Sequence, residues 1–446
     1  MRVTMRKLSM LVLITVLMIT AFTMNGTAVQ GASIEVEAES AIVVDANTGK
    51  ILYEKESDLK LPPASMTKMM TEYLVLEAIS NGDISWDTTT QISDYAYWLS
   101  SDNTFSGIGL TQAKDYTVRE LYEAMAIISD NGTTVALAEL VAGSEGEFVN
   151  MMNEKAEEMG LTEYKFVNAS GLSNSDLGEY HPEGTEPNAD NLLSARSSAL
   201  LAYHLINDHP EVLEISSMTT SELDGHTLEN WNRMLPSWNN DNFAQFAYEG
   251  VDGLKTGHTD AAGYCFTGTA QQGDRRLITV VMKTDSEEKR FQETKKLMEY
   301  GFSQFESSEL FPAGYQIEDQ ATLPIAKGKD KQVNIATAEP FTSMIASGEE
   351  ELYSVEYDID EELLAEDGRL EAPIESGEKV GEAVLVYAGE TDYGYIDENG
   401  GGQRVDLVTT SGVEKANWFM LSMGAIGNFF SGLFSTVVDF FKGLFS

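Results

Sequence analysis

Cysteine and histidine are both scarce in this chain. Cys265 is the only cysteine among 446 residues, so no disulfide can form within the chain. It lies in an alternating apolar stretch, which favours a small buried side chain over a reactive thiol. The five histidines form no His-x-x-x-His pair and no Cys/His cluster, which is the spacing that zinc sites need. We therefore expect no metal and no other cofactor.

Basic residues are also few. The chain carries 29 Lys and Arg against 72 Asp and Glu, a formal net charge of −43. Binding to nucleic acid needs clustered Lys and Arg that neutralise phosphates, so this class of partner is excluded. The excess of acids instead indicates a solvated acidic surface. With 446 residues and 42% hydrophobic content, the chain is long enough for two or three globular units.

Residues 1–31 predict an export signal. A basic stretch ends at Lys7, an apolar run extends from residue 8 to residue 24, and small residues offer cleavage after Ala28 or Gly31. The alternative is an uncleaved membrane anchor. In both cases we expect an exported protein that acts at the outer face of the cytoplasmic membrane.

Residues 32–305 predict an α/β domain built on an antiparallel sheet. Two hairpins are expected, over residues 41–54 and 263–283, each with a Gly-containing turn. These strands lie near the two ends of the region, with helical patterns between them. Such an order indicates a sheet flanked by helices, with a helical subdomain inserted.

Helical periodicity covers residues 118–158, with one break near Ser129, and returns over residues 192–207. A helix over residues 287–302 is expected to close the domain. The polar stretch 172–190, which is rich in Gly, Pro, Asn and Glu, predicts an extended surface loop.

The composition changes after the first domain. Residues 306–410 hold short strand-like runs separated by acidic stretches, which predicts a small β-rich domain without evident chemistry. Residues 411–446 predict an amphipathic helix, because apolar residues recur at helical spacing with an aromatic face from Phe429 onward. We expect this helix to lie in the membrane interface as an anchor. A spanning helix over 416–438 and a helix packed on its own domain are the alternatives.

Lys255-Thr256-Gly257 occurs once and begins a probable strand edge. An ammonium and a hydroxyl side by side suit a substrate carboxylate. Gly257 removes a side chain where a ligand must lie along the strand. An isolated motif of this kind can also be an ordinary turn, but two further motifs lie upstream of it.

Ser65 and Lys68 are three residues apart, so on a helix they share a face and can touch. A serine hydroxyl needs an adjacent base, and a desolvated lysine has a lowered pKa that suits this task. Ser65 follows Pro-Pro-Ala and opens an apolar helix, whose N–H groups favour developing negative charge. The same spacing recurs in two polar, charged stretches, Ser57…Lys60 and Ser286…Lys289.

Ser129-Asp130-Asn131 lies between two helical runs, where a tight loop can aim a hydroxyl and an amide into a cleft. We expect the Ser129 hydroxyl to relay a proton and the Asn131 amide to hold the substrate backbone. A turn with capping residues is the alternative. The duplicate at 101–103 lies in a loop without flanking helices.

These three motifs, in this order, resemble those of the low-molecular-mass penicillin-binding proteins, the serine-type D-Ala-D-Ala carboxypeptidases. The resemblance covers roughly residues 38–305 and includes the segments 160–172 and 252–281. It implies a penicillin-binding-protein/β-lactamase-like transpeptidase domain that removes the terminal D-Ala from peptidoglycan pentapeptide stems. β-Lactam antibiotics are then expected to be covalent inhibitors.

The resemblance also implies residue roles. The catalytic roles fall on Ser65 as the acylated nucleophile, Lys68 as its base and Ser129 as a proton shuttle. The oxyanion is expected between the backbone N–H groups of Ser65 and His258. Substrate binding falls on Asn131, Lys255, Thr256, Gly257 and His258.

Two features depart from that family. The stretch 172–190 is longer than the usual connection, so substrate entry is expected to differ. Asp130 stands where the family commonly has Gly, whereas class A β-lactamases have Asp at this position. Those enzymes need a Glu that activates water, in a Glu-x-x-x-Asn loop, whereas Glu186-Pro-Asn-Ala-Asp190 has Asp in the Asn position. A β-lactamase is therefore the weaker interpretation.

Two other functions involve the same residues: one uses them for catalysis, and the other is not catalytic. A D,D-endopeptidase acting on cross-linked muropeptides needs an identical site and stays open. A non-catalytic penicillin-binding scaffold is disfavoured, because a chain without activity is expected to have lost at least one reactive side chain. All four are present: Ser65, Lys68, Ser129 and Lys255.

Overall fold

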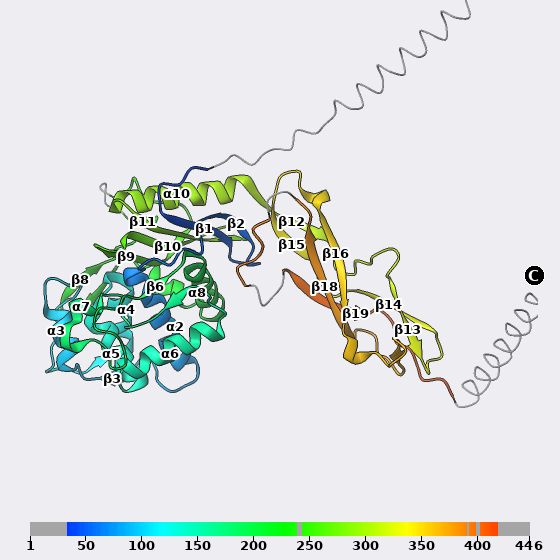
Figure 1. Ribbon diagram of the computed structural model, residues 1–446, viewed down its shortest axis with the longest axis horizontal. Helices are drawn as coiled ribbons and strands as arrows, with labels where there is room; N and C mark the ends of the chain where they lie inside the picture. Colours follow the sequence, from blue (N-terminus) through cyan, green and yellow to red (C-terminus); the bar gives the residue numbers. More distant parts are fainter. Residues whose placement is uncertain (1–33, 239–242, 390–391, 398–401, 418–446) are drawn as a thin grey trace, which may run out of the picture. The chain divides into compact units, whose positions relative to one another are not determined.

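The computed structural model describes residues 34–238, 243–389, 392–397 and 402–417 (Figure 1). The predicted export signal and residues 418–446 of the predicted anchor lie outside the described residues. Within the described ranges, no helix is long and apolar enough to cross a membrane.

Five antiparallel strands form the main sheet, in the order β2-β1-β11-β10-β9. β1 (Ser40–Asp45) and β2 (Ile51–Lys55) form the predicted N-terminal hairpin. β10 (Gly263–Gln272) and β11 (Arg275–Thr284) form the second predicted hairpin. β9 (Val251–Thr259), which carries the Lys-Thr-Gly motif, is the last strand in this order. The predicted strand edge is therefore a true edge of the sheet.

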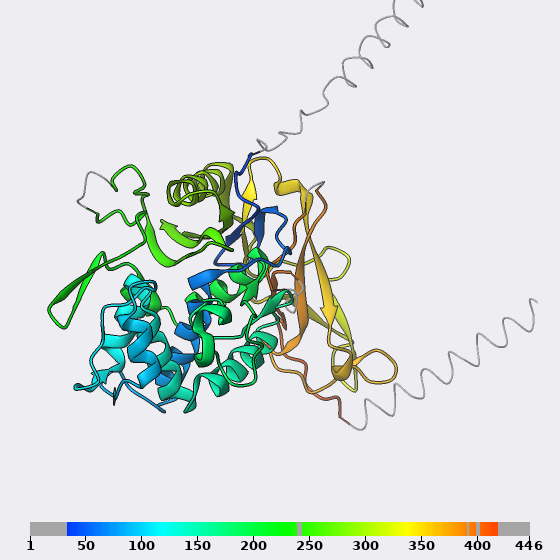
Figure 2. The same ribbon diagram turned by 60° about the vertical axis from the view of Figure 1, so that its left-hand side comes forward.

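Helices cover both faces of this sheet. α10 (Glu287–Gln304) packs against β10 and β11 on one face, and α8 (Ala195–Asp208) packs against β1 and β11 on the other (Figures 1 and 2). Between β2 and β9 the chain forms the helical subdomain, so the predicted insertion is confirmed. Its other helices are α2 (Lys68–Ser80), α3 (Asp94–Ser101), α4 (Val118–Ile128), α5 (Asn131–Ala142), α6 (Glu145–Glu158), α7 (Asn174–Leu177) and α9 (Val212–Ser216).

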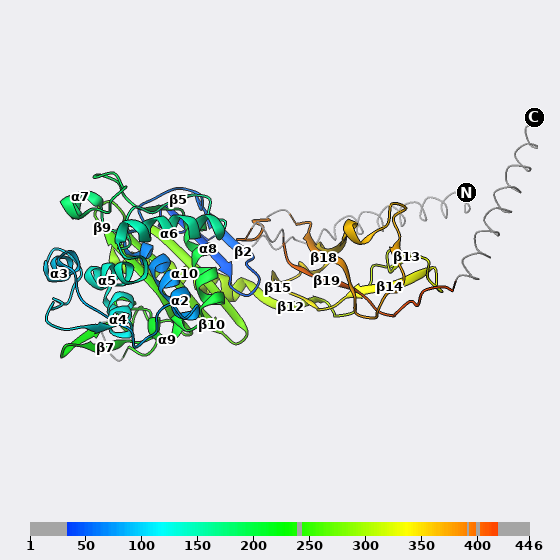
Figure 3. The same ribbon diagram turned by 90° about the horizontal axis from the view of Figure 1, so that it is seen from below.

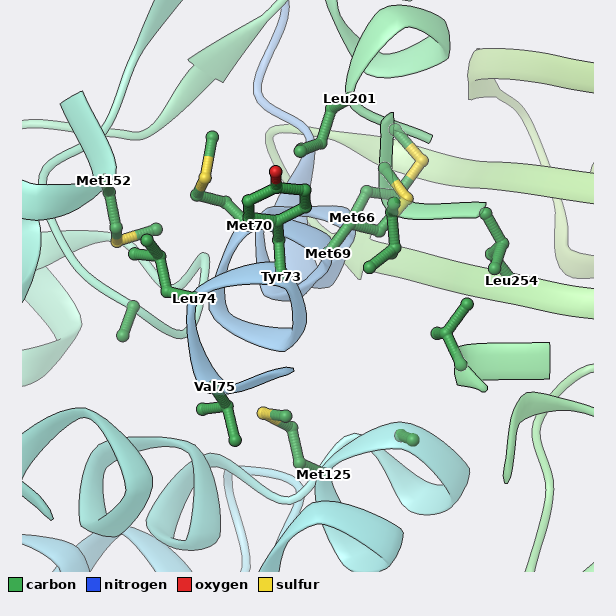
Figure 4. Packing of buried hydrophobic residues seen from close by; sticks show 14 of the residues in the cluster. Met66, Met69, Met70, Tyr73, Leu74, Val75, Met125, Met152, Leu201 and Leu254 are labelled. Atoms are coloured by element: carbon green, nitrogen blue, oxygen red, sulfur yellow. The ribbon is translucent and has the colours of Figure 1, made fainter. Parts of the chain in front are cut away.

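The core of the subdomain surrounds α2, which is buried along almost its whole length. α2 packs against α4, α5, α6 and α8. Methionine side chains fill much of this space, because their flexible thioethers adapt to irregular gaps. Figure 4 shows Met69, Met70, Leu74 and Val75 of α2 beside Met125 and Met152 of neighbouring helices. α2 is thus a rigid support for the side chains at its N-terminus.

Two helix boundaries differ from the prediction. Residues 118–158 break a second time, because Gly143 adopts a left-handed conformation with φ +82° and Ser144 then caps α6. α8 begins at Ala195 rather than at residue 192, with Ser194 as its N-cap. The preceding residues Leu192–Leu193 instead form β6. Three pairs of short strands complete the subdomain: β3 (Thr89–Thr90) with β4 (Tyr116–Thr117), β5 (Tyr164–Lys165) with β6, and β7 (Thr220–Leu223) with β8 (His226–Glu229).

The stretch 172–190 is mostly exposed, as predicted, but it is not wholly extended. It holds α7 and a short 3-10 turn, Gly178–Tyr180. The buried amide of Asn174 donates to Thr185 Oγ1 and to the Glu186 carbonyl, each at 2.9 Å. A buried polar side chain therefore ties the two halves of this loop together.

The C-terminal part is β-rich, as predicted, and Figure 3 shows several of its strands. A six-stranded sheet has the order β16-β18-β19-β14-β13-β17, and a separate pair joins β12 to β15. Residues 411–417 also belong to this part, because Val413 bridges Ile374 and Lys415 bridges Gly328. The strands are β12 (Phe305–Phe311), β13 (Thr322–Ala326), β14 (Gln332–Thr337), β15 (Phe341–Ala346), β16 (Tyr353–Ile359), β17 (Leu370–Glu371), β18 (Lys379–Tyr387) and β19 (Arg404–Thr409).

Candidate active site

Ser65 lies in a short 3-10 turn, Ala64–Thr67, that leads directly into α2 at Lys68. The predicted helix therefore begins with a 3-10 turn, which is wound more tightly than the expected α-helix. Ala64 adopts a left-handed conformation with φ +48°. Such a conformation is costly for a residue with a side chain and persists only where the surroundings enforce it.

Two glycines allow other backbone segments to approach this turn closely and to hold Ala64 in its left-handed conformation. A Cβ on Gly171 would lie 2.0 Å from the Ala64 carbonyl oxygen, and a Cβ on Gly257 would lie 2.4 Å from that of Pro63. Neither distance can accommodate a side chain. The turn that carries Ser65 is thus held between the loop at residue 171 and the edge strand β9.

Lys68 is fully buried, and its ammonium group has three partners. Its Nζ donates to Ser170 O at 2.7 Å and to Asn131 Oδ1 at 2.8 Å, and it lies 3.2 Å from Ser65 Oγ. These partners come from three separate segments of the chain. The predicted contact of Lys68 with Ser65 is formed, and Asn131 is brought to the same lysine.

These three contacts decide how Lys68 and Ser65 interact when the lysine is neutral. A carbonyl oxygen and an amide oxygen only accept hydrogen bonds, so they take the two N–H groups of the neutral amine. The remaining lone pair of Nζ then faces the Ser65 hydroxyl, which must donate to it. Burial lowers the pKa of Lys68 well below its ordinary value, and the charge of Lys255 lowers it further. The geometry and the pKa both favour Lys68 as the base for Ser65.

Ser129 occupies the one-residue link between α4 and Asp130, in a left-handed conformation with φ 62°. Its hydroxyl is buried and makes no hydrogen bond to the described residues. Buried hydroxyl groups normally have a partner. The Ser129 hydroxyl is therefore free to bond a ligand that enters the site.

Asp130, which departs from the family pattern, has a structural role in its hydrogen bonds. Its carboxylate accepts from Thr133 N at 2.8 Å, which caps α5, and from Ile108 N at 2.8 Å and Ser100 Oγ at 3.1 Å. The next residue, Asn131, donates through both its backbone and its side-chain amide to Ser106 O, at 2.9 and 3.2 Å. Asp130 thus fastens the segment 100–108 against the active-site amide.

Lys255 and Thr256 are buried on β9, with 2% and 4% exposure. Among the described residues, Lys255 Nζ has one weak hydrogen bond, to Thr256 O at 3.3 Å. Burial lowers the pKa of Lys255, while Glu72 raises it and Arg290 lowers it. Most of the hydrogen-bonding capacity of this ammonium group is available to an anion.

His258 follows the motif at the exposed end of β9. Its ring stacks on Tyr264 with centroids 3.9 Å apart, and its Nδ1 lies 2.9 Å from Gly263 O. The ring is therefore engaged by the neighbouring strand β10. This leaves the backbone N–H of His258, rather than its imidazole, as the group expected to serve the site.

Sequence reasoning did not find three buried residues at the site. The Ser170 carbonyl reaches Lys68 because Asn168 Oδ1 accepts from the N–H groups of Ser170 and Gly171, at 3.2 and 2.7 Å. Arg290 of α10 donates to the Gly257 carbonyl at 3.3 Å. The third is Glu72, one turn after Lys68 on α2. The segment 168–171 lies within the predicted family segment 160–172, but the other two have no motif.

The duplicate motifs are engaged elsewhere. Lys60 pairs with Glu163 at 2.7 Å on the surface, and Ser286 caps α10 by accepting from Lys289 N. The carboxylate of Asp102 accepts from Thr104 at the surface. None of these contacts involves the residues around Ser65. No group of three or more metal-binding side chains is found in the described part of the chain.

The comparisons with known proteins agree with this arrangement. A D-alanyl-D-alanine carboxypeptidase family model matches residues 25–286, and the penicillin-binding protein 5 C-terminal domain matches residues 305–415. The D-alanyl-D-alanine carboxypeptidase DacF of Bacillus subtilis is 34% identical over 79% of this chain and 82% of its own length.

Solved structures show the same fold. A peptidoglycan synthesis regulatory factor (PBP3) of Streptococcus pneumoniae has a TM-score of 0.71 and 35% identity, over 85% of this chain and 100% of its own. Penicillin-binding protein D2 of Listeria monocytogenes, solved with bound cefotaxime, has a TM-score of 0.51 and 36% identity, over 60% of this chain and 99% of its own. Fold and site together define a serine hydrolase of the penicillin-binding class. The chain belongs to the D-alanyl-D-alanine carboxypeptidase family.

Proposed function

We propose that this protein is a serine-type D-Ala-D-Ala carboxypeptidase that removes the terminal D-alanine from peptidoglycan pentapeptide stems. The observation that carries the proposal is the contact between the buried Lys68 and Ser65, on the turn clamped by the Lys-Thr-Gly strand. A buried amine beside a serine is suited to acyl transfer. A second buried amine at the sheet edge is suited to a terminal carboxylate.

Acylation begins when the Ser65 hydroxyl gives its proton to neutral Lys68 Nζ. The Ser65 oxygen bonds to the carbonyl carbon of the penultimate D-Ala, and the carbonyl electrons move to its oxygen. The N–H groups of Ser65 and His258 stabilise that oxyanion. The C–N bond then breaks, and the leaving nitrogen receives the proton from Lys68 through the Ser129 hydroxyl. Lys68 is neutral again, and the free D-Ala departs.

Deacylation repeats the sequence with water. Lys68 takes a proton from the water as its oxygen bonds to the acyl carbon. The bond to Ser65 Oγ breaks, and the proton returns to that oxygen. The products are the shortened peptide and the free enzyme, so every proton and electron pair is accounted for.

The terminal carboxylate of the substrate is assigned to Lys255 and Thr256. Lys255 offers a buried ammonium group with spare donors, and Thr256 offers a hydroxyl on the same strand. The Arg290 guanidinium donates a hydrogen bond to the Gly257 carbonyl on this strand and adds positive charge. β-Lactams carry a carboxylate next to a reactive amide, so we propose that they acylate Ser65 by the same route.

We also propose that the protein is exported and attached to the membrane by its C-terminal helix. The support is the sequence pattern of residues 1–31 and 411–446. The β-rich part would then separate the active site from the membrane surface.

The decisive assay measures D-alanine released from a pentapeptide ending in D-Ala-D-Ala. We expect release by the wild type and a loss of roughly 10⁴-fold or more for Ser65→Ala or Lys68→Ala. Lys60→Ala is the matched control, because this exposed lysine has the same spacing from a serine, and it should leave release unchanged.

Three outcomes would redirect the proposal. Absence of D-alanine release and of Ser65-dependent labelling by fluorescent penicillin would refute it. Release only from cross-linked dimers would establish the endopeptidase instead. Rapid turnover of penicillin would establish the β-lactamase.

A further inference from the structure

Residues 167–172 form a loop beside the N-terminus of α2, without helix or strand, and residues 167–171 are buried. A buried backbone of this kind needs partners for its N–H groups. Here all six N–H groups donate to side-chain oxygens. The pairs are Val167 and Asn168 with Asn191 Oδ1, Ala169 with Glu145 Oε1, Ser170 and Gly171 with Asn168 Oδ1, and Leu172 with Ser170 Oγ. The path of this loop is therefore set by a few side chains.

Asn168 serves the two peptide units that flank Ser170. Its Oδ1 accepts from Ser170 N at 3.2 Å and from Gly171 N at 2.7 Å, and it also accepts from Ser170 Oγ at 3.1 Å. The side chain is completely buried. Its carboxamide is oriented by hydrogen bonds to Leu172 O, Asn174 Oδ1 and Asn191 Nδ2, at 2.8, 2.9 and 2.9 Å. Asn168 is thus a fixed acceptor beneath Ser170.

The geometry of the peptide bond turns this acceptor into a constraint on Lys68. A trans peptide unit is planar, so its C=O and N–H groups point in opposite directions. The Ser170 carbonyl and the Gly171 N–H belong to one such unit. While Asn168 holds the N–H, the carbonyl must point away from Asn168, and there it accepts from Lys68 Nζ at 2.7 Å.

The preceding peptide unit is arranged in the same way. Its N–H, on Ser170, points to Asn168, and its carbonyl, on Ala169, accepts from Thr71 Oγ1 at 2.9 Å. Lys68 and Thr71 are three residues apart on α2, so they lie on one face of that helix. Asn168 therefore sets two successive carbonyl groups against the same face of α2.

The direction of the Ser170 carbonyl matters for proton transfer. Neutral Lys68 has two N–H groups and one lone pair. The Ser170 carbonyl and the Asn131 amide oxygen take the two N–H groups, which leaves the lone pair for the Ser65 hydroxyl. If the carbonyl turned away, an N–H group of Lys68 could donate to Ser65 Oγ instead. An amine in that orientation cannot take the serine proton.

We propose that Asn168 is a positioning residue for acylation. By holding the Gly171 N–H it aims the Ser170 carbonyl at Lys68, and it thereby directs the lone pair of the neutral amine toward Ser65. Asn168 touches no substrate in this role. This inference rests on the acyl transfer proposed above, because that reaction makes Lys68 the base.

The test is the acylation of Asn168→Leu by fluorescent penicillin. Leucine keeps the size of the side chain and removes the acceptor. Rates at several penicillin concentrations separate the dissociation constant of the first complex from the first-order rate constant of acylation, and the labelled fraction at completion counts the intact sites. We expect the rate constant per intact site to fall roughly 10²-fold, the cost of about 1 Å of misplacement in a reacting group. The dissociation constant should stay unchanged. A merely structural defect would instead lower the labelled fraction.

Asn174→Leu is the matched control. Asn174 is equally buried, and its side chain bonds Asn168 Nδ2, Thr185 Oγ1 and the Glu186 carbonyl, each at 2.9 Å. The same substitution there breaks a comparable set of hydrogen bonds but leaves the Gly171 N–H on Asn168. This variant should lose thermal stability and keep its acylation rate constant. An equal loss of rate in both variants would overturn the role of Asn168.

Asn168→Asp tests for rescue. Aspartate keeps an acceptor for the Ser170 and Gly171 N–H groups but loses the donor to Leu172 O and Asn174 Oδ1. It should therefore lose stability, as Asn174→Leu does, yet keep a rate constant within about tenfold of the wild type, because the acceptor is retained. An Asn168→Asp protein that folds but acylates as slowly as Asn168→Leu contradicts the proposal.

Hydrogen–deuterium exchange provides a measurement that needs no reaction. Fragments that span residues 166–172 are followed by mass spectrometry in the intact proteins. We expect slow exchange in the wild type and faster exchange in Asn168→Leu, because the Ser170 and Gly171 N–H groups lose their acceptor. Equally slow exchange in Asn168→Leu would show that the loop is held without Asn168, and the proposal would fail.

These measurements separate failure of this inference from failure of the proposed function. If the wild type releases no D-alanine but Asn168→Leu slows penicillin acylation as expected, the carboxypeptidase assignment is wrong and the role of Asn168 stands. If D-alanine is released and Asn168→Leu acylates at the wild-type rate, the role of Asn168 is refuted. Should Asn168→Leu fail to fold, wild-type exchange and Asn168→Asp decide: rapid exchange of the loop in the wild type, or slow acylation by the aspartate variant, refutes the role.

Discussion

At the scale of single residues, burial changes the chemistry of ordinary side chains. A lysine on a solvated helix is a permanent cation, but Lys68 is enclosed and its ammonium form is disfavoured. Lys255 is equally enclosed, yet Glu72 opposes the loss of its charge. Cys265, in contrast, is a buried thiol whose pKa burial raises to about 11, so it is inert as predicted.

Gly257→Ala tests the close contact between β9 and the nucleophile turn. The added Cβ would lie 2.4 Å from the Pro63 carbonyl oxygen, so the turn that carries Ser65 must move. A displacement of about 1 Å in a reacting group costs roughly 10²-fold, and we expect at least this loss in kcat/KM. Steady-state release of D-alanine measures it.

Gly268→Ala provides the control for that variant. Gly268 lies on β10, where an added Cβ would meet the movable ends of Phe266 and Met298 at 2.8 and 3.1 Å. This variant should lose thermal stability but keep most of its kcat/KM. Equal losses of activity in the two variants would show that the contact of Gly257 is not special.

At the scale of elements, the turn between α4 and α5 organises one wall of the site. The Asp130 side chain is buried in this turn. Its carboxylate accepts hydrogen bonds from α5, from the end of α3 and from the segment around Ile108. The same turn directs Asn131 toward Lys68. Asp130 departs from the family pattern, and its hydrogen bonds to the neighbouring loop give the structural reason.

Asp130→Ala tests this connection. The substitution leaves the Ile108 N–H and the Ser100 hydroxyl without their charged acceptor. Hydrogen bonds to a charged group contribute about 1.5–3 kcal/mol each, so for these two bonds we expect a loss of about 3–6 kcal/mol in the free energy of unfolding. Denaturant unfolding measures this loss, and kcat/KM should fall as Asn131 loses its support.

Asp102→Ala is the corresponding substitution in the duplicate motif. Its carboxylate contacts Thr104 at the surface, so the free energy of unfolding should change by less than about 0.5 kcal/mol. If Asp130→Ala is as mild as this control, the carboxylate does not hold the segment 100–108.

At the scale of the whole molecule, the catalytic and C-terminal parts have different compositions and different architectures. The C-terminal part is a β-rich assembly with its own apolar clusters, around Ile335 and around Phe341. The described chain ends beside this part, where Ala416 N donates to Lys327 O at 2.8 Å. Residues 418–446 of the predicted anchor follow immediately afterwards.

Deletion of residues 418–446 is expected to release the protein from membranes and to retain D-alanine release from a soluble peptide. The cut preserves the hydrogen bond of Ala416, so the β-rich part stays intact. Membrane and soluble fractions are compared by sedimentation. Persistent membrane association would instead indicate an uncleaved N-terminal signal.

Paired substitutions distinguish an interfacial helix from a spanning one. Phe430→Asp with Phe434→Asp places charges on the predicted apolar face, whereas Ser431→Asp with Ser435→Asp places them on the polar face. An interfacial helix should detach only in the first variant, because only its apolar face enters the lipid. A spanning helix should be disrupted by both.

The sequence by itself determined the class of fold, the two hairpins and the order of the three motifs. These features depend on local periodicity and on short spacings, which neighbouring residues encode. It also separated Ser65 from its duplicates, because only Ser65 opens an apolar helix. Helix boundaries such as that at Ala195 were less certain, because the pairing of Leu192–Leu193 with Tyr164–Lys165 overrides their helical pattern.

Only the tertiary structure decided which groups surround the reacting atoms. Two of the three partners of Lys68 lie 63 and 102 residues further along the chain, and Arg290 lies 33 residues beyond Gly257. No local pattern marks a carbonyl such as that of Ser170, or an acid such as Glu72, as part of a site. Their roles arise from burial, which strengthens every nearby charge and excludes the water that would otherwise screen it.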